Sequence, residues 1–126
     1  MIDHIVVSVR NLEASRRFYA AALAPLGYGV VKESGDLVGF GSGSKADLWI
    51  WKREPQSRET HVAFRCASRG MVDAFHAAAL QAGARDNGAP GLRAIYHPDY
   101  YGAFLLDPDG NNIEAVCHEP VAQAKR

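Results

Sequence analysis

The feature that most constrains this 126-residue chain is an internal repeat with a spacing of 57 residues. Residues 18–23 read FYAAAL and residues 75–80 read FHAAAL, so five of the six positions are identical. The same spacing relates His4 to His61, near the start of each copy. Self-similarity at a fixed spacing indicates two copies of one supersecondary unit. A histidine at the same place in both copies suggests a symmetric site. Because histidine is the commonest metal ligand, we first expect a metal site.

Length and charge limit the classes of function. A chain of this length can bury a real core, so we expect one domain over residues 1–126. Lysine plus arginine and aspartate plus glutamate number 14 each, and nucleic-acid binding needs clustered basic charge, so we expect no nucleic-acid partner. No apolar run is long enough to span a membrane and no signal peptide opens the chain, so we expect a cytoplasmic protein without a membrane partner.

Each copy is predicted to be a β-α-β-β-β module. Module one covers about residues 1–55 and module two about residues 58–118. Both modules open with a strand rich in β-branched residues, followed by a helix that Asn11 or Ser68 caps. The strands are expected at residues 2–10, 28–33, 37–41, 46–52, 61–66, 92–97, 102–107 and 112–118, with an irregular stretch at 85–90. The two cysteines, Cys66 and Cys117, lie in apolar strand-like runs and are expected to act as small buried hydrophobes.

Alternation along the strands assigns the polar residues to one face of each sheet. In the opening strands, the apolar sets should meet the helices, which leaves His4 and His61 on the opposite face. In the last strand of each module, the same argument assigns Glu114, Trp49 and Trp51 to that face. A carboxylate directed into a half-apolar surface needs a partner, and a metal held by two imidazoles would supply one.

The sequence resembles the vicinal oxygen chelate superfamily, which includes glyoxalase I, fosfomycin-resistance thiol transferases, bleomycin-binding proteins and extradiol dioxygenases. The resemblance covers roughly residues 1–118. It is carried by the opening IDHI at residues 2–5, by NLE and FY in residues 11–19, by THVAF at residues 60–64, and by FLLDPDGNNIE at residues 104–114. It implies an α+β fold in which two tandem β-α-β-β-β modules form a U-shaped groove of mixed sheet.

The resemblance also implies a divalent metal ion, which would be zinc, iron, manganese or nickel. Carried over by position, the metal ligands are His4, His61 and Glu114. The fourth family position, on the last strand of module one, falls near Trp49, which cannot ligate a metal. This departure argues against a glyoxalase I assignment and leaves coordination positions open for substrate.

Three further side chains and the two tryptophans are candidates for binding and catalysis. Trp49, Trp51 and Tyr101 are expected to wall the groove, and Arg65 to pair with a substrate anion or a nearby carboxylate. His97 and Tyr101 lie in an aromatic stretch that suggests a lid, where His97 would act as a general acid or base and Tyr101 as a hydrogen-bond donor.

We therefore expect a small metal-dependent enzyme, a lyase, transferase or dioxygenase. It would act on a small molecule through a chelated vicinal-oxygen or enolate intermediate. Two alternatives stay open: a lyase or isomerase resembling lactoylglutathione lyase, and a non-catalytic binding protein of the bleomycin-resistance type. Related short proteins commonly dimerise, so we expect a homodimer.

Overall fold

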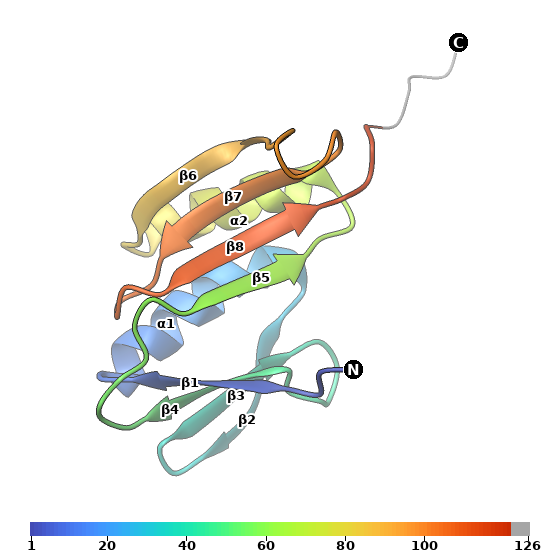
Figure 1. Cartoon of the computed structure of the whole chain (residues 1–126). Helices are drawn as coiled ribbons and strands as arrows, with labels where there is room; N and C mark the ends of the chain where they lie inside the picture. The colour runs from blue at the N-terminus through green and yellow to red at the C-terminus, as the bar shows by residue number, and fades with distance from the viewer. Residues whose placement is uncertain (122–126) are drawn as a thin grey trace.

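The computed structural model describes residues 1–121 and contains two four-stranded mixed sheets with one α-helix each (Figure 1). The first sheet has the strand order β1-β4-β3-β2 and the second β5-β8-β7-β6. The elements of the first module are β1 (Ile5–Val9), α1 (Leu12–Leu23), the 3-10 turn η1 (Ala24–Leu26), β2 (Gly29–Ser34), β3 (Leu37–Gly41) and β4 (Leu48–Lys52). Those of the second are β5 (His61–Arg65), α2 (Arg69–Gln81), β6 (Arg85–Leu92), β7 (Tyr101–Leu106) and β8 (Asn112–Cys117). This is the α+β fold of two tandem β-α-β-β-β modules that the repeat predicts.

The two sheets share one pairing pattern. In each, the first and last strands of the module are parallel neighbours, and the remaining pairs are antiparallel. Val6 pairs with Trp49 in the first sheet, and Ala63, which lies 57 residues after Val6, pairs with Glu114 in the second. Trp49 therefore occupies in module one the position that Glu114 occupies in module two.

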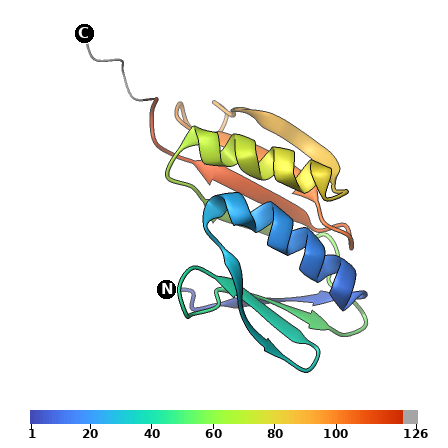
Figure 2. The same ribbon diagram turned by 180° about the vertical axis from the view of Figure 1, so that it is seen from behind.

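The helices begin at equivalent caps and cover the same side of the molecule. The Asn11 side chain accepts a hydrogen bond from the backbone N–H of Ala14 at 3.0 Å, and Ser68 accepts one from Met71 at 3.2 Å. Each such cap contributes about 1 kcal/mol of helix stability. Figure 2 shows α1 and α2 side by side on one side of the two sheets, so the opposite sheet faces stay open.

The core lies between the helices and the sheets and includes residues from both modules. Its fully buried members in module one include Val7, Val9, Phe18, Tyr19, Leu48 and Ile50, and those in module two include Val72, Phe75, Leu105 and Ile113. Cys66 and Cys117 are both buried and unpaired, as the sequence predicts. Burial raises the pKa of the Cys66 thiol to about 11, which keeps it protonated.

The strand before the long loop differs from the expectation. The sequence predicts an irregular stretch at residues 85–90 and a strand at 92–97, whereas β6 spans Arg85–Leu92 and turns follow it. The register shifts between Asp86 and Gly88 and again between Gly88 and Gly91, so the strand is bulged. Glycine spacing of this kind resembles a loop in sequence, but it permits the backbone of a bulge.

Among residues 1–121, no helix has the length and apolar character that a membrane crossing requires.

A buried carboxylate at the β7–β8 turn connects the two modules. Asp107 is 4% exposed and accepts the backbone N–H groups of Asp109 at 2.9 Å and Asn111 at 2.8 Å, and the Asn111 side chain at 3.0 Å. The two backbone groups donate to Oδ1, whereas the Asn111 side chain and the Tyr19 hydroxyl of α1 both donate to Oδ2. Burial beside this carboxylate holds the pKa of Tyr19 well above its usual range, so the hydroxyl stays a donor.

Replacing Asp107 is therefore expected to destabilise the fold more than replacing Tyr19. Asp107→Ala leaves several buried donors without an acceptor and should lower the free energy of unfolding by about 3 kcal/mol or more. Tyr19→Phe removes one bond and should cost about 1 kcal/mol. Urea unfolding measures both, with Tyr96→Phe as the control because Tyr96 is 62% exposed. Equal losses for Asp107→Ala and Tyr96→Phe would contradict the structural role of the turn.

Candidate functional site

The second sheet brings His61 and Glu114 together on its open face. His61 Nε2 lies 2.8 Å from Glu114 Oε1. The Glu114 residue is only 1% exposed, whereas the His61 side chain is 52% exposed. A carboxylate buried to this extent needs partners for both oxygens. The second oxygen, Oε2, accepts the hydroxyl of Tyr100.

The Tyr100 hydroxyl donates its hydrogen bond to Glu114 at any ordinary pH. Burial and the neighbouring carboxylate raise the pKa of Tyr100 well above its usual range, so its hydroxyl stays protonated. Gly102 of β7 makes room for this contact, because a Cβ there would come within 3.2 Å of the Tyr100 ring and 3.3 Å of Glu114 Oε2. The position of Glu114 is thus fixed from two sides.

An aromatic ring and an arginine extend the site beyond this pair. Phe104 of β7 pairs with Glu114, and its ring centroid lies 6.1 Å from that of His61. The guanidinium carbon of Arg93 lies 5.5 Å from the centroid of the same ring. The site therefore runs from Glu114 and His61 across Phe104 to Arg93.

The His61–Glu114 pair fits two ligands of one divalent ion. Ligand atoms about 2.1 Å from a shared metal lie about 3 Å apart when their bonds meet near a right angle. The observed separation of 2.8 Å between Nε2 and Oε1 is close to that value. In the single chain this contact is a hydrogen bond in which Nε2 donates to the carboxylate. A divalent ion would take the place of that proton, because neutral imidazole nitrogen and carboxylate oxygen are both donors that such ions accept.

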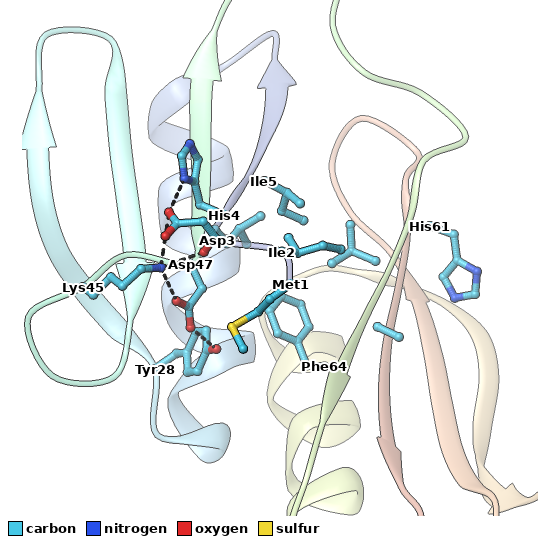
Figure 3. Close-up of a pocket in the computed structure, with 13 residues that line it drawn as sticks. Met1, Ile2, Asp3, His4, Ile5, Tyr28, Lys45, Asp47, His61 and Phe64 are labelled. Carbon is cyan, nitrogen blue, oxygen red and sulfur yellow. Dashed lines mark hydrogen bonds and ion pairs between the residues drawn. The ribbon is translucent and has the colours of Figure 1, made fainter.

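His4, the third expected ligand, does not join this pair within one chain. His4 and His61 both border a cleft of about 690 Å³ between the two modules. Figure 3 shows the two histidines on opposite sides of this cleft, with Ile2 and Ile5 between them. Within residues 1–121 of a single chain, no three His, Cys, Asp or Glu side chains are close enough to hold a metal ion. One chain therefore supplies two of the three expected ligands at one place and the third at another.

The His4 imidazole is nevertheless held in a defined orientation. Its Nδ1 lies 2.7 Å from Asp3 Oδ1, and an ionised carboxylate only accepts, so Nδ1 carries the proton. The hydrogen bond to His4 and the charge of Lys45 lower the pKa of Asp3, which keeps it ionised. In the neutral imidazole, Nε2 is then the free acceptor. A carboxylate on the far nitrogen is the usual arrangement behind a metal-ligating histidine.

Lys45 and Asp47 connect this pair to the first sheet. Lys45 Nζ donates to the Asp3 carbonyl at 2.6 Å and to Asp47 at 3.1 Å (Figure 3). The Tyr28 hydroxyl donates to the other oxygen of Asp47 at 2.6 Å. Desolvation and this bond raise the pKa of Tyr28 to about 12.

The two tryptophans lie on β4 of the first sheet and are both half-buried. Trp49 packs over Gly39, where a Cβ would approach the indole to 2.9 Å. The guanidinium carbon of Arg53 lies 4.0 Å from the Trp51 ring. Arg65 is exposed on β5, where alternation puts it on the same face as His61.

Tyr101 does not point to the open face, contrary to the expectation. Its hydroxyl donates to Asp73 of α2 at 2.6 Å, on the helix side of the sheet. The reason is strand alternation: β7 begins at Tyr101, so Tyr101 and Gly102 face opposite sides. The neighbouring Tyr100 makes the contact with Glu114 instead.

His97 anchors the loop that carries Tyr100. The backbone N–H of Asp99 donates to His97 Nδ1 at 3.0 Å, so the proton of neutral His97 is on Nε2. That nitrogen lies 2.7 Å from His118 Nδ1, beyond the end of β8. Both ring nitrogens are engaged, and the ring centroid lies 5.5 Å from that of Tyr100. An acid–base role for His97 stays a prediction.

Sequence reasoning missed Tyr100, Phe104 and Arg93. Gly102 could have indicated Tyr100. A glycine inside a predicted strand often marks a position that another group approaches closely, and here that group is the Tyr100 ring. No comparable pattern in the sequence indicated that Arg93 reaches Phe104, because the bulges of β6 decide it.

Comparisons with known proteins agree on one family. The model of the Glyoxalase/Bleomycin resistance protein/Dioxygenase superfamily matches residues 1–115. A glyoxalase/bleomycin resistance protein from Albidiferax ferrireducens T118 is 32% identical with a TM-score of 0.80, over 94% of this chain and 98% of that one. No curated protein matches the sequence.

Two further solved structures share the fold at lower identity. A glyoxalase/bleomycin resistance protein/dioxygenase family enzyme from Burkholderia phytofirmans PsJN has 20% identity and a TM-score of 0.73, over 94% of this chain and 98% of that one. Lactoylglutathione lyase from Agrobacterium tumefaciens has 20% identity and a TM-score of 0.66, over 93% and 92%. Taken with the paired modules and the match to residues 1–115, the chain belongs to the Glyoxalase/Bleomycin resistance protein/Dioxygenase superfamily.

Proposed function

We propose that the protein is a metal-dependent enzyme that works as a homodimer, with His4 of one subunit completing a site formed by His61 and Glu114 of the other. Members of this superfamily typically bind a divalent metal ion. The observation that carries the proposal is the His61–Glu114 pair, whose donor atoms lie 2.8 Å apart on an open sheet face.

The internal symmetry supports a site built from two subunits. His4 and His61 hold equivalent positions in equivalent modules, yet the cleft separates them within one chain. A two-fold homodimer can bring module one of each subunit onto module two of the other, and it forms two identical sites. Apolar side chains that lie exposed in the single chain suit such a contact: Val6 is 45%, Tyr96 62% and Ile95 88% exposed.

The residues of the chain prepare this site for oxygen ligands. Tyr100 keeps one oxygen of Glu114 occupied, so the carboxylate presents the other oxygen beside His61. Asp3 orients His4 so that Nε2 is its free nitrogen. A bound divalent ion would act as a Lewis acid that polarises a carbonyl or holds two adjacent oxygens of a small molecule. Trp49, in the position equivalent to Glu114, adds no fourth ligand and offers an aromatic wall.

A non-catalytic small-molecule binding protein is the second candidate. It is favoured by the fact that a single chain, over residues 1–121, gathers two donors and not three. The half-buried Trp49 and Trp51 suit ligand binding without chemistry. Metal content separates the two candidates, because a purely sequestering groove does not need the ion.

Mixed dimers test the shared site directly. Homodimers of His4→Ala or of His61→Ala contain no complete site, whereas a heterodimer of the two variants contains one intact site. Co-expression with two affinity tags isolates the heterodimer, and calorimetric titration with Zn²⁺ measures its sites. We expect one Zn²⁺ per heterodimer and none for either homodimer.

The matched control is His61→Ala paired with Glu114→Ala. Both changes remove a ligand that module two supplies, so each of the two sites in this heterodimer lacks one ligand. Failure of the first pair to restore binding would contradict the shared site, as would a monomer mass in light scattering.

Trp49→Glu should tighten metal binding. The substitution adds a carboxylate at the position equivalent to Glu114, and an added charged ligand should raise the affinity about tenfold or more. Trp51→Glu is the matched control, because it lies two residues along the same face of β4. The prediction is wrong if the two variants, both folded by circular dichroism, have equal metal affinity.

Tyr100→Phe should weaken metal binding without removing a ligand. The change frees Glu114 Oε2 from its donor, and losses of outer hydrogen bonds typically lower metal affinity by about 10–100-fold. Tyr101→Phe is the control, because its hydroxyl contacts Asp73 on the helix side. Unchanged Zn²⁺ affinity in Tyr100→Phe would show that Tyr100 does not orient Glu114 for a metal.

A further inference from the structure

Arg93 is a fixed cation beside the candidate site, and the proposed chemistry does not use it. Its guanidinium stacks over Phe104, whose ring also lies next to His61. One of its nitrogens, Nη2, donates to the Ala89 carbonyl at 2.7 Å. Its backbone N–H donates to the Tyr100 carbonyl at 2.7 Å, so Arg93 and Tyr100 close the same loop. Arg93 and the Glu114 partner Tyr100 are therefore direct neighbours.

The backbone of β6 makes room for this side chain. A Cβ on Gly91 would come within 3.0 Å of Arg93 Nη1, and one on Gly88 within 3.3 Å of Nη2. The same Cβ on Gly88 would come within 2.8 Å of the Phe104 ring. Both glycines lie at the register shifts of β6, so the residues that form the bulges are also those that leave space for the Arg93 side chain.

Arg93 has no acidic partner in the part of the chain that the structure describes, residues 1–121. None of its nitrogens lies within ion-pair distance of a carboxylate there, whereas Arg16 pairs with Glu33 and Arg69 with Asp99. A guanidinium carries five N–H donors, and the Ala89 carbonyl takes one of them. The remaining donors are free to hold an anion in the bidentate geometry that arginine favours.

We propose that Arg93 binds an anionic group of the substrate, so that the ligand is a small organic acid with oxygen donors at one end and a carboxylate or phosphonate at the other. The inference rests on the proposed site at His61 and Glu114, which would take the oxygen end. Phe104, between His61 and Arg93, contacts the body of the ligand.

A matched pair of probes tests this directly: 3,4-dihydroxybenzoate and 3,4-dihydroxybenzamide. Both carry adjacent oxygens on a flat ring, and only the first has a negative charge at the opposite end. Calorimetry on the full chain, with and without Zn²⁺, measures their affinities. We expect the acid to bind at least about tenfold more tightly than the amide, as a charge-assisted contact predicts. Arg93→Gln should remove this preference by weakening binding of the acid to about the affinity of the amide.

Arg85→Gln is the matched control, because Arg85 is an exposed arginine at the start of β6, the strand that Arg93 directly follows. It should keep the wild-type preference for the acid. Arg93→Lys keeps the charge but loses the bidentate geometry, so its preference should be reduced and not abolished. This variant also decides the matter if Arg93→Gln does not fold, since an unchanged preference in Arg93→Lys overturns the inference.

The outcomes separate this inference from the proposed function. Equal binding of acid and amide by the wild type, or binding of neither, overturns the role of Arg93. Loss of the preference in Arg93→Gln together with unchanged Zn²⁺ affinity supports it. A wild-type protein that prefers the acid through Arg93 but binds none of Zn²⁺, Fe²⁺, Mn²⁺ and Ni²⁺ supports the anion site and overturns the metal-dependent function.

Discussion

A carboxylate with almost no exposure on an open sheet face is the constraint on which the candidate site depends. Glu114 is 1% exposed, and an unpartnered charge there would cost several kcal/mol. Three features offset that cost: His61 contacts one carboxylate oxygen, Tyr100 donates to the other, and Gly102 has no side chain that would block the Tyr100–Glu114 contact. A structural role alone is a weak reason to keep a charged group at a buried position, because well-packed apolar residues are often as stable there.

Duplication produced two equivalent positions that now differ in chemistry. Trp49 and Glu114 share one place in the register of their modules, yet one is an aromatic ring over Gly39 and the other a ligand candidate. His4, directly before β1, and His61, at the start of β5, are equivalent histidines, but their supports differ. His4 is oriented by Asp3, whereas His61 faces Glu114 directly. The two modules are therefore complementary: one supplies an oriented imidazole and aromatic walls, and the other supplies the buried carboxylate.

The loop at residues 93–100 of the second module supplies two residues to the candidate site. Its ends are tied by the Arg93–Tyr100 backbone bond, and the His97–His118 contact anchors its middle to the segment after β8. The loop follows directly after the bulged strand β6. As a result, one short segment delivers both the donor to Glu114 and the cation over Phe104. Loops commonly carry specificity on a scaffold that the sheets provide.

The sequence by itself determined the α+β fold, because the repeat, the caps at Asn11 and Ser68 and the strand periodicity are local signals that agree with one another. It also predicted that His61 and Glu114 share a face, since alternation has a fixed period of two. Tertiary structure alone decided the rest. Tyr101 contacts Asp73 on the helix side and the preceding Tyr100 contacts Glu114, while Arg93, which follows the bulged strand β6, lies over Phe104. The separation of His4 from His61 likewise depends on how the modules pack, which no local pattern encodes.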